Sequence, residues 1–217
     1  IDPSEIPSVI SRGRQAKPVI YKTVFKEEHL VRPKDSNAPF ILEQYYQSPE
    51  EFIPIFEASL PYLTLLVNCI YWEDRFPRLV TRSFLNRSWN KKPFSLQVIG
   101  DISCDIEGAI EITHKPTEPD QPAYTYLPKD GSFVDRCVAE GISVMAVDNL
   151  PCEFPKASSR AFGEALMPFV PQIAAADFSL PWARCKLPDA LVRATILHQG
   201  KLTPDFSYLT SHLDGES

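Results

Sequence analysis

Three near-continuous apolar runs of strand length stand out along the chain. They cover residues 63–70, 97–103 and 142–147, and each closes on a cluster of polar residues. Runs of this kind are typical of strands covered on both faces in a parallel sheet. We therefore expect three buried parallel strands and an α/β fold class, with the polar clusters gathered at one edge of the sheet.

Helical spacing is found on either side of these runs. Pro3, Ser4 and Glu5 predict a short N-terminal helix that carries Ile6, Val9 and Ile10. Ser48, followed by Pro49 and two acids, predicts a helix that places Phe52, Ile55, Phe56 and Leu60 on one face and ends at Pro61. Two further helices are expected over residues 155–176, with a restart past Pro168, and over residues 187–196.

Proline interrupts the region between the second and third strand runs. Residues 107–130 contain Pro116, Pro119, Pro122 and Pro128, which rule out a long helix. We expect an excursion there that ends in a short hairpin around residues 129–131. Residues 18–25 are β-branched and aromatic and predict an extended segment.

Composition narrows the class of protein. The 217 residues carry a net charge of -6, so no basic field indicates binding to nucleic acid or to an anionic membrane. The longest apolar run is too short to span a bilayer. Five cysteines without a C-x-x-C or a histidine at zinc spacing suggest buried thiols in a reducing compartment and no metal site. Because residue 1 is not Met and no signal peptide follows, we expect a piece of a longer chain.

The polar residues that follow the strand runs are the first candidates for a site. Asp105 and Asp148 can accept hydrogen bonds from an ammonium or a carboxamide, Ser103 offers a hydroxyl, and Tyr71 offers an aromatic face with a phenol. The alternative is that Asp101 and Asp148 only cap the turns that follow their strands. Residue types alone leave both interpretations open.

Familiar catalytic motifs are absent from the sequence. It contains no G-x-S-x-G, no G-x-x-x-x-G-K-[ST] and no G-x-G-x-x-G, and its eight glycines are too scattered to build a phosphate cradle. The four histidines are also scattered, and we interpret them as surface or helix-end residues. The chain therefore holds no complete catalytic set.

Several motifs nevertheless resemble one enzyme family. They are LVNCIYWE (66–73) with PRLVT (77–81), DISCDIEGAIE (101–111), and VDNLPCEFPKAS (147–158) with Phe162 and Gly163. In this order they resemble the lysine-ketoglutarate reductase part of the bifunctional aminoadipic semialdehyde synthases, from about Pro3 to Leu209. These enzymes are related to the lysine-forming saccharopine dehydrogenases and, more distantly, to alanine dehydrogenase.

The resemblance implies a fold and a division of the chain. In that family two Rossmann-like domains enclose the active site, and the catalytic Lys and His lie in the N-terminal domain. Residues 1–155 would form the second half of the dinucleotide-binding domain, with a parallel sheet flanked by helices and the excursion at 107–130. Residues 156–217 would form a C-terminal helical segment that returns toward the N-terminal substrate domain. Both that domain and the Gly-rich loop would precede residue 1.

The resemblance also implies roles for strand-end residues. Contacts with the cofactor, NADPH, would come from Tyr71, Ile102, Val147, Asp148, Asn149 and Leu150. Ser103, Cys104 and Asp105 would contact saccharopine, the product that forms from L-lysine and 2-oxoglutarate. Cys104 departs from the Ala common in the family, and Asn149 from the His of the single-function enzymes. A C-terminal saccharopine dehydrogenase domain would be a further partner. The resemblance implies that the protein is located in the cytoplasm or, alternatively, in the mitochondrial matrix.

A second hypothesis belongs to a different class of protein. A non-catalytic homologue or regulatory module would keep the cleft and bind an amino acid or nucleotide without turnover. A Gly-rich strand-turn-helix upstream, preceded by a domain with Lys and His, would favour the enzyme.

Overall fold

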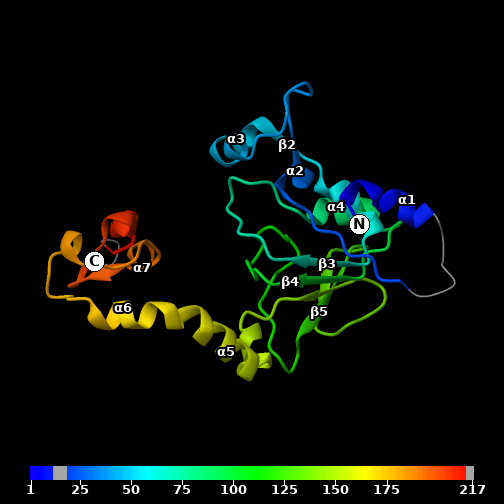
Figure 1. The fold of residues 1–217 in the computed structure, drawn as a ribbon. Coiled ribbons are helices and arrows are strands. Elements are labelled where there is room, and N and C mark those ends of the chain that lie inside the picture. The colour runs from blue at the N-terminus through cyan, green and yellow to red at the C-terminus, as the bar shows by residue number, and fades with distance from the viewer. Residues whose placement is uncertain (12–18, 214–217) are drawn as a thin grey trace. The chain divides into compact units, whose positions relative to one another are not determined.

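The computed structural model describes residues 1–11 and 19–213, and its contacts divide the chain into two compact units. The first unit spans Ile1–Leu150 and the second Pro151–Ser217. The two are described separately below (Figure 1). Within the described residues, no helix has the length and apolar content that crossing a membrane requires.

A five-stranded sheet forms the centre of the first unit. Its order is β3 (Leu65–Asn68), β4 (Val98–Asp101), β7 (Ile142–Met145), β5 (Ala123–Leu127) and β6 (Ser132–Val134). β3, β4 and β7 are parallel, whereas β5 runs antiparallel to β7 and β6 antiparallel to β5. The three strands expected from the apolar runs are therefore parallel neighbours, and the predicted α/β class with a Rossmann-like parallel sheet is confirmed.

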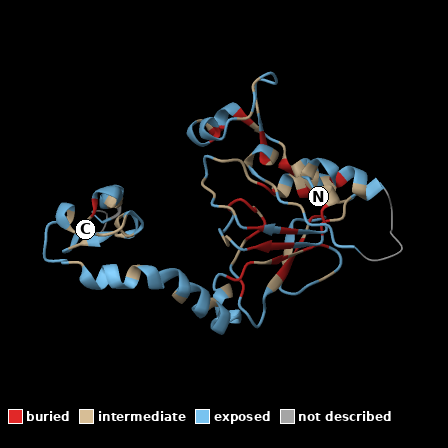
Figure 2. Ribbon diagram, viewed as in Figure 1, coloured by how far each residue is buried: buried red, intermediate tan, exposed pale blue. Residues whose placement is uncertain are grey.

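Burial along the sheet differs from the expectation in one respect. Ile99 and Val144 are fully covered, but on β3 Leu65 and Val67 are 55% and 54% exposed while Leu66 between them is buried. The prediction that each strand is covered on both faces is therefore wrong for β3. This strand lies at the end of the sheet order, and one of its faces is open (Figure 2).

The helix predicted from Ser48 to Pro61 is also wrong. A single 3-10 turn, η2 (Pro49–Glu51), leads into β2 (Phe52–Pro54), which pairs antiparallel with β1 (Val31–Pro33), and η3 (Phe56–Tyr62) follows. Pro54 explains the break, because a helix from Pro49 would need its missing N–H and would bring its ring against the carbonyl of Glu50. Phe52, at 6% exposed, is buried from a strand instead.

The N-terminal helix is confirmed as η1 (Pro3–Glu5) followed by α1 (Ile6–Ser11). Residues 19–26 form neither helix nor strand, and Pro18 lies outside the described residues. Three short helices were not predicted from the sequence: α2 (Glu27–Leu30), α3 (Leu42–Gln47) and α4 (Arg82–Ser88). Thr81 caps α4 by accepting the backbone N–H of Phe84 at 3.2 Å.

The proline-rich excursion contains no helix, as expected. Its predicted hairpin is formed by β5 and β6, and Gly131 in the turn has a φ of +76°, a conformation that favours glycine. Tyr124 and Tyr126 on β5 are 1% and 0% exposed and belong to the hydrophobic core.

The second unit consists of short elements. The predicted helix over residues 155–176 is confirmed as α5 (Pro155–Leu166), η5 (Met167–Phe169) and α6 (Val170–Ala175), while the helix predicted over 187–196 is shorter, α7 (Asp189–Ala194). The remaining elements are η4 (Leu150–Glu153), η6 (Trp182–Arg184), β8 (Leu197–His198), β9 (Lys201–Leu202), η7 (Pro204–Leu209) and α8 (Thr210–Leu213). The β8–β9 hairpin turns at Gly200 and was not predicted.

Candidate functional site

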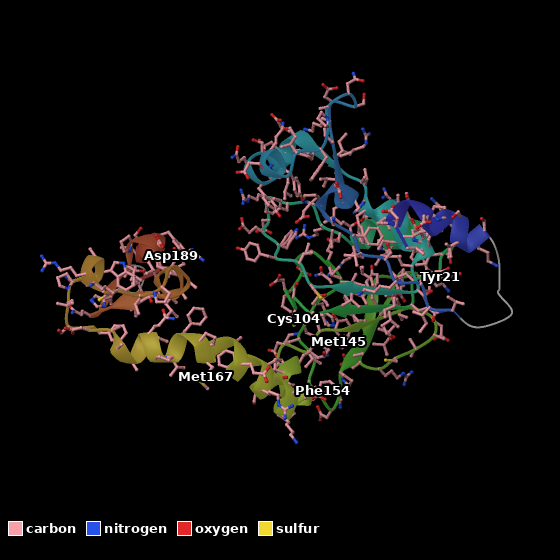
Figure 3. All side chains as sticks on the ribbon, viewed as in Figure 1. Tyr21, Cys104, Met145, Phe154, Met167 and Asp189 are labelled. Atoms are coloured by element: carbon pink, nitrogen blue, oxygen red, sulfur yellow. The ribbon has the colours of Figure 1, made fainter. Side chains whose placement is uncertain are left out.

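The carboxyl ends of β3, β4 and β7 lie at the same edge of the sheet, because the three strands are parallel. Tyr71 follows β3, Ile102 to Asp105 follow β4, and Val147 to Leu150 follow β7. The predicted site residues thus gather at one edge, with Cys104 at the end of β4 (Figure 3). In open parallel sheets this edge is where ligands bind.

Asp101 is a buried residue that connects the strand ends at this edge through hydrogen bonds. The residue is only 1% exposed, and its carboxylate accepts Nδ2 of Asn68 at 2.8 Å and Oγ1 of Thr113 at 2.6 Å. It also accepts the backbone N–H of Cys104 at a longer 3.4 Å. The alternative interpretation of Asp101 as a turn cap is therefore supported, and its carboxylate additionally joins the ends of β3 and β4.

The backbone after β4 is fixed on both sides. Ile102 donates its N–H to the carbonyl of Asn68 at 2.8 Å, and Ser103 Oγ donates to the carbonyl of Ile70 at 2.6 Å. On the other side, Cys104 Sγ donates to the carbonyl of Ala146 at 2.9 Å. Cys104 has a φ of +56°, so its backbone adopts the left-handed conformation, which is uncommon for a residue other than glycine.

Cys104 is a hydrogen-bond donor rather than a nucleophile. Burial raises the pKa of its thiol, and the carboxylates of Asp101, Asp148 and Asp105 raise it further. Because the thiolate is the reactive form, a raised pKa makes this thiol less reactive than an ordinary cysteine. Its Sγ–H holds the loop after β4 against the end of β7.

Asp105 and Asp148 are the carboxylates that this edge offers to a ligand. Both residues are exposed, and within the described residues neither carboxylate forms a hydrogen bond. The capping alternative is therefore not observed for Asp148. Burial, followed by the negative charge of Asp101, raises the pKa of Asp105. A cationic group placed beside Asp105 would find an acceptor whose negative charge is otherwise unpaired.

The predicted cofactor-binding residues differ in how much of their surface is exposed to a ligand. Tyr71 is 83% exposed, Ile102 is 38% exposed, and Asp148 and Asn149 are also exposed. Val147 is 3% exposed and lies in a parallel bridge with Thr117, so it offers almost no surface to a ligand. Exposed apolar and polar groups fit one end of a dinucleotide, whereas the glycines in the described part of the chain provide no loop for its pyrophosphate.

Sequence reasoning assigned no role to two members of this network. Asn68 stands inside an apolar run, at 2% exposed, and Thr113 lies in the proline-rich excursion and is fully buried. The signal for Asn68 was present, because a polar residue at a buried strand position needs a partner. The partner itself lies 33 residues away and could not be identified from spacing.

A metal centre is not indicated by side-chain geometry. Among residues 1–11 and 19–213, no three His, Cys, Asp or Glu side chains come together in a way that could hold a metal ion.

The parallel strands with their polar carboxyl ends define a Rossmann-like α/β domain. Comparison with sequence families then gives a more specific result, since the family described as "Alanine dehydrogenase/PNT, C-terminal domain" matches residues 72–205. The chain belongs to this family.

Curated relatives support the same relationship. The chain is 35% identical over 96% of its length to an alpha-aminoadipic semialdehyde synthase of Arabidopsis thaliana, and 30% identical over 96% to the mitochondrial enzyme of that name from Rattus norvegicus. It is 31% identical over 56% of its length to a saccharopine dehydrogenase [NAD(+), L-lysine-forming] of Yarrowia lipolytica. The chain spans only 20%, 24% and 31% of these three relatives, respectively.

Proposed function

We propose that this chain is the C-terminal portion of a lysine-ketoglutarate reductase, which condenses L-lysine with 2-oxoglutarate and reduces the product to saccharopine with NADPH. The observation that carries the proposal is the 35% identity over nearly the whole chain to an alpha-aminoadipic semialdehyde synthase. The exposed carboxylates at the carboxyl edge of the sheet support it, since they suit a substrate that carries ammonium groups.

The proposal assigns different tasks to the two parts of the chain. Residues 1–155 would supply half of the cofactor domain, and residues 156–217 would lead back to an N-terminal substrate domain. The acid and base that form the imine would come from that other domain, because this chain contains no complete catalytic set. We place the enzyme in the cytoplasm, with the mitochondrial matrix as the alternative that the name of the rat relative suggests.

The strand-end residues would bind and orient the cofactor and the substrate. Tyr71, Ile102 and the exposed part of residues 147–150 would hold the nicotinamide end of the cofactor, which supplies a hydride when it is bound. Ser103 can still accept a hydrogen bond after donating to Ile70, and Asp105 can accept a substrate ammonium. Cys104 would act through its backbone position, because its thiol is turned to the carbonyl of Ala146.

The choice of NADPH over NADH follows the more extensive likeness to the bifunctional enzymes. Those relatives match 96% of the chain, whereas the saccharopine dehydrogenase of Yarrowia lipolytica, named for NAD(+), matches 56%. The residue that would contact the ribose 2′ position is expected before residue 1.

The decisive experiment measures NADPH oxidation that depends on lysine and 2-oxoglutarate. A protein in which this chain is joined to its N-terminal domain should show the activity, while the purified 217-residue chain alone should show none. Activity in the isolated chain would refute the division of tasks. A longer protein with bound cofactor but no turnover would favour the non-catalytic alternative.

Two matched variants of that longer protein test the strand-end residues. Asp105→Asn keeps the shape of the side chain but removes its charge, so use of lysine should weaken by on the order of 1.5–3 kcal/mol with cofactor affinity nearly unchanged. Asp148→Asn should instead weaken chiefly the cofactor. Normal kinetics of Asp105→Asn with every substrate would remove Asp105 from the site.

A further inference from the structure

A pocket of about 320 Å³ opens beside the end of β3, within the unit of residues 1–150. Its walls come from residues 25–30, from α3 and from residues 70–79. They are rich in aromatic side chains, including Phe25, Tyr45, Trp72 and Phe76. This volume is at the lower end of the range for small-molecule sites. Of the predicted cofactor contacts, Tyr71 lines this pocket while Ile102 and residues 147–150 do not.

Tyr45 is the most deeply buried polar side chain of this wall. It is 5% exposed and packs against Phe52 and Phe76, with ring centres 5.2 and 5.3 Å away. Burial raises its pKa to about 12, so the phenol stays protonated. Within the described residues its hydroxyl forms no hydrogen bond, whereas the buried Tyr124 hydroxyl donates to the carbonyl of Ile112 at 2.9 Å. The Tyr45 ring is buried, but its hydroxyl is not among the buried side-chain atoms that lack a partner in the described residues, so it is accessible at the pocket and can donate to a ligand.

Arg78 contributes a cation without a carboxylate partner. Its half-buried guanidinium lies 5.3 Å from the Trp72 ring centre and donates to the carbonyls of Glu107, at 2.9 Å, and Gly108, at 3.1 Å. Carbonyl oxygens orient the guanidinium but leave its charge uncompensated. No ion pair of the described residues includes Arg78, whereas Arg75 on the same wall pairs with Glu73 at 2.9 Å.

The other charges of the wall do not cancel that of Arg78. Besides the Arg75–Glu73 pair, the pocket is lined by Lys26 and Glu27, and Glu27 already accepts the Tyr46 hydroxyl at 2.7 Å. The wall thus combines aromatic surface, a free phenol donor and an excess positive charge. A cationic ligand would be repelled there, and a purely apolar one would leave Arg78 and Tyr45 unpaired.

We propose that this pocket binds a small molecule made of a flat aromatic ring that carries an anionic group, either a carboxylate or a phosphate. The ring packs on the aromatic walls, the anion accepts from Arg78, and the Tyr45 phenol donates to the ligand. Guanidinium groups on aromatic faces are well suited to such anions, because they combine charge with a fork of donors. The proposal does not depend on the reductase function.

Fluorine NMR with four small fluorinated aromatic probes tests the proposal on the 217-residue chain. 4-Fluorobenzoate and 4-fluorophenyl phosphate stand for the two anions, and 4-fluorobenzyl alcohol and 4-fluorobenzylamine serve as the neutral and cationic controls. We expect at least one of the two anionic probes to bind about tenfold more tightly than the amine and more tightly than the alcohol. Equal or tighter binding of the amine, or no binding of either anion at millimolar concentration, would overturn the proposal.

Paired variants identify the groups responsible. Arg78→Gln keeps donors for the two carbonyls but loses the charge, so anion binding should fall about tenfold while alcohol binding is retained. Arg87→Gln, with the same charge change outside the pocket, is the control. Tyr45→Phe should weaken the anionic probe severalfold, and Tyr62→Phe should not. Unchanged anion binding in a folded Arg78→Gln chain contradicts the proposal, and if that variant unfolds, Tyr45→Phe and the probe order decide.

Discussion

Replacing Asp101 by alanine is the sharpest test of how the edge of the sheet is organised. The change removes the acceptor of the Asn68 amide and of the Thr113 hydroxyl, both of which are buried. A buried group that loses its partner costs about 1–3 kcal/mol, so the two together cost roughly 2–6 kcal/mol. Since a domain is stable by only about 5–15 kcal/mol, the loss should be easy to detect.

Urea unfolding of the 217-residue chain, followed by tryptophan fluorescence, measures this loss. Asp101→Asn keeps one acceptor oxygen and should be less harmful than Asp101→Ala, and Thr113→Val should cost only one hydrogen bond. Asp148→Ala is the matched control, because it removes an exposed carboxylate from the same edge and should change stability by no more than about 0.5 kcal/mol. If Asp101→Ala and Asp148→Ala unfold at the same urea concentration, Asp101 does not hold the strand ends together.

Three further predictions concern stability. The pKa of Asp105 is raised in the folded state, so just above the ordinary aspartate pKa the folded protein binds more protons than the unfolded protein. Its free energy of unfolding should therefore decrease as the pH rises through this range. Urea titrations should show a weaker dependence on pH for Asp105→Asn. The pKa of His114 is lowered chiefly by burial and also by Lys115 and Arg82, against the opposing effect of Asp135 and Glu107. Stability should therefore be lost as pH falls below about 6.5, and His114→Gln should lose less of it between pH 7 and pH 5. In thermal melts Gly141→Ala should be destabilising by about 1–3 kcal/mol, because its Cβ would collide with Tyr126 O and Thr125 Cγ2, whereas Gly163→Ala in α5 meets no atom within 4 Å and should stabilise by up to about 1 kcal/mol. A pH profile of Asp105→Asn or His114→Gln that runs parallel to that of the unaltered chain would contradict the corresponding expectation, as would equal melting temperatures for the two alanine variants.

The sequence was sufficient to predict the parallel part of the sheet and the hairpin, because both depend on local signals. Apolar runs identified β3, β4 and β7, and the residues around Gly131 identified the turn between β5 and β6. The antiparallel pairing of β5 with β7 depends on contacts between distant segments and was not predicted. The helix predicted after Ser48 failed because apolar spacing outweighed Pro54 in the interpretation, although a proline at that position is decisive.

The candidate site, like the fold, could be predicted from the sequence only in part. Its location followed from parallel strand ends, since residues after such strands share an edge. The buried network around Asp101 joins residues that are 33 and 12 positions apart, and burial decides which carboxylate supports the fold and which faces solvent. The pocket beside β3 likewise combines residues 25–30, 45–46 and 70–79, a set that no spacing in the sequence marks.

The connections within the sheet have a consequence for the order of folding. β5 and β6 are joined by residues 128–131 alone, whereas residues 69–97 separate β3 from β4 and residues 102–141 separate β4 from β7. Closing a long loop costs more chain entropy than closing a short one and slows folding. The hairpin should therefore form early, as the template on which β7 and then β4 and β3 assemble. Hydrogen-exchange labelling during refolding should show protection in β5 and β6 before it appears in β3.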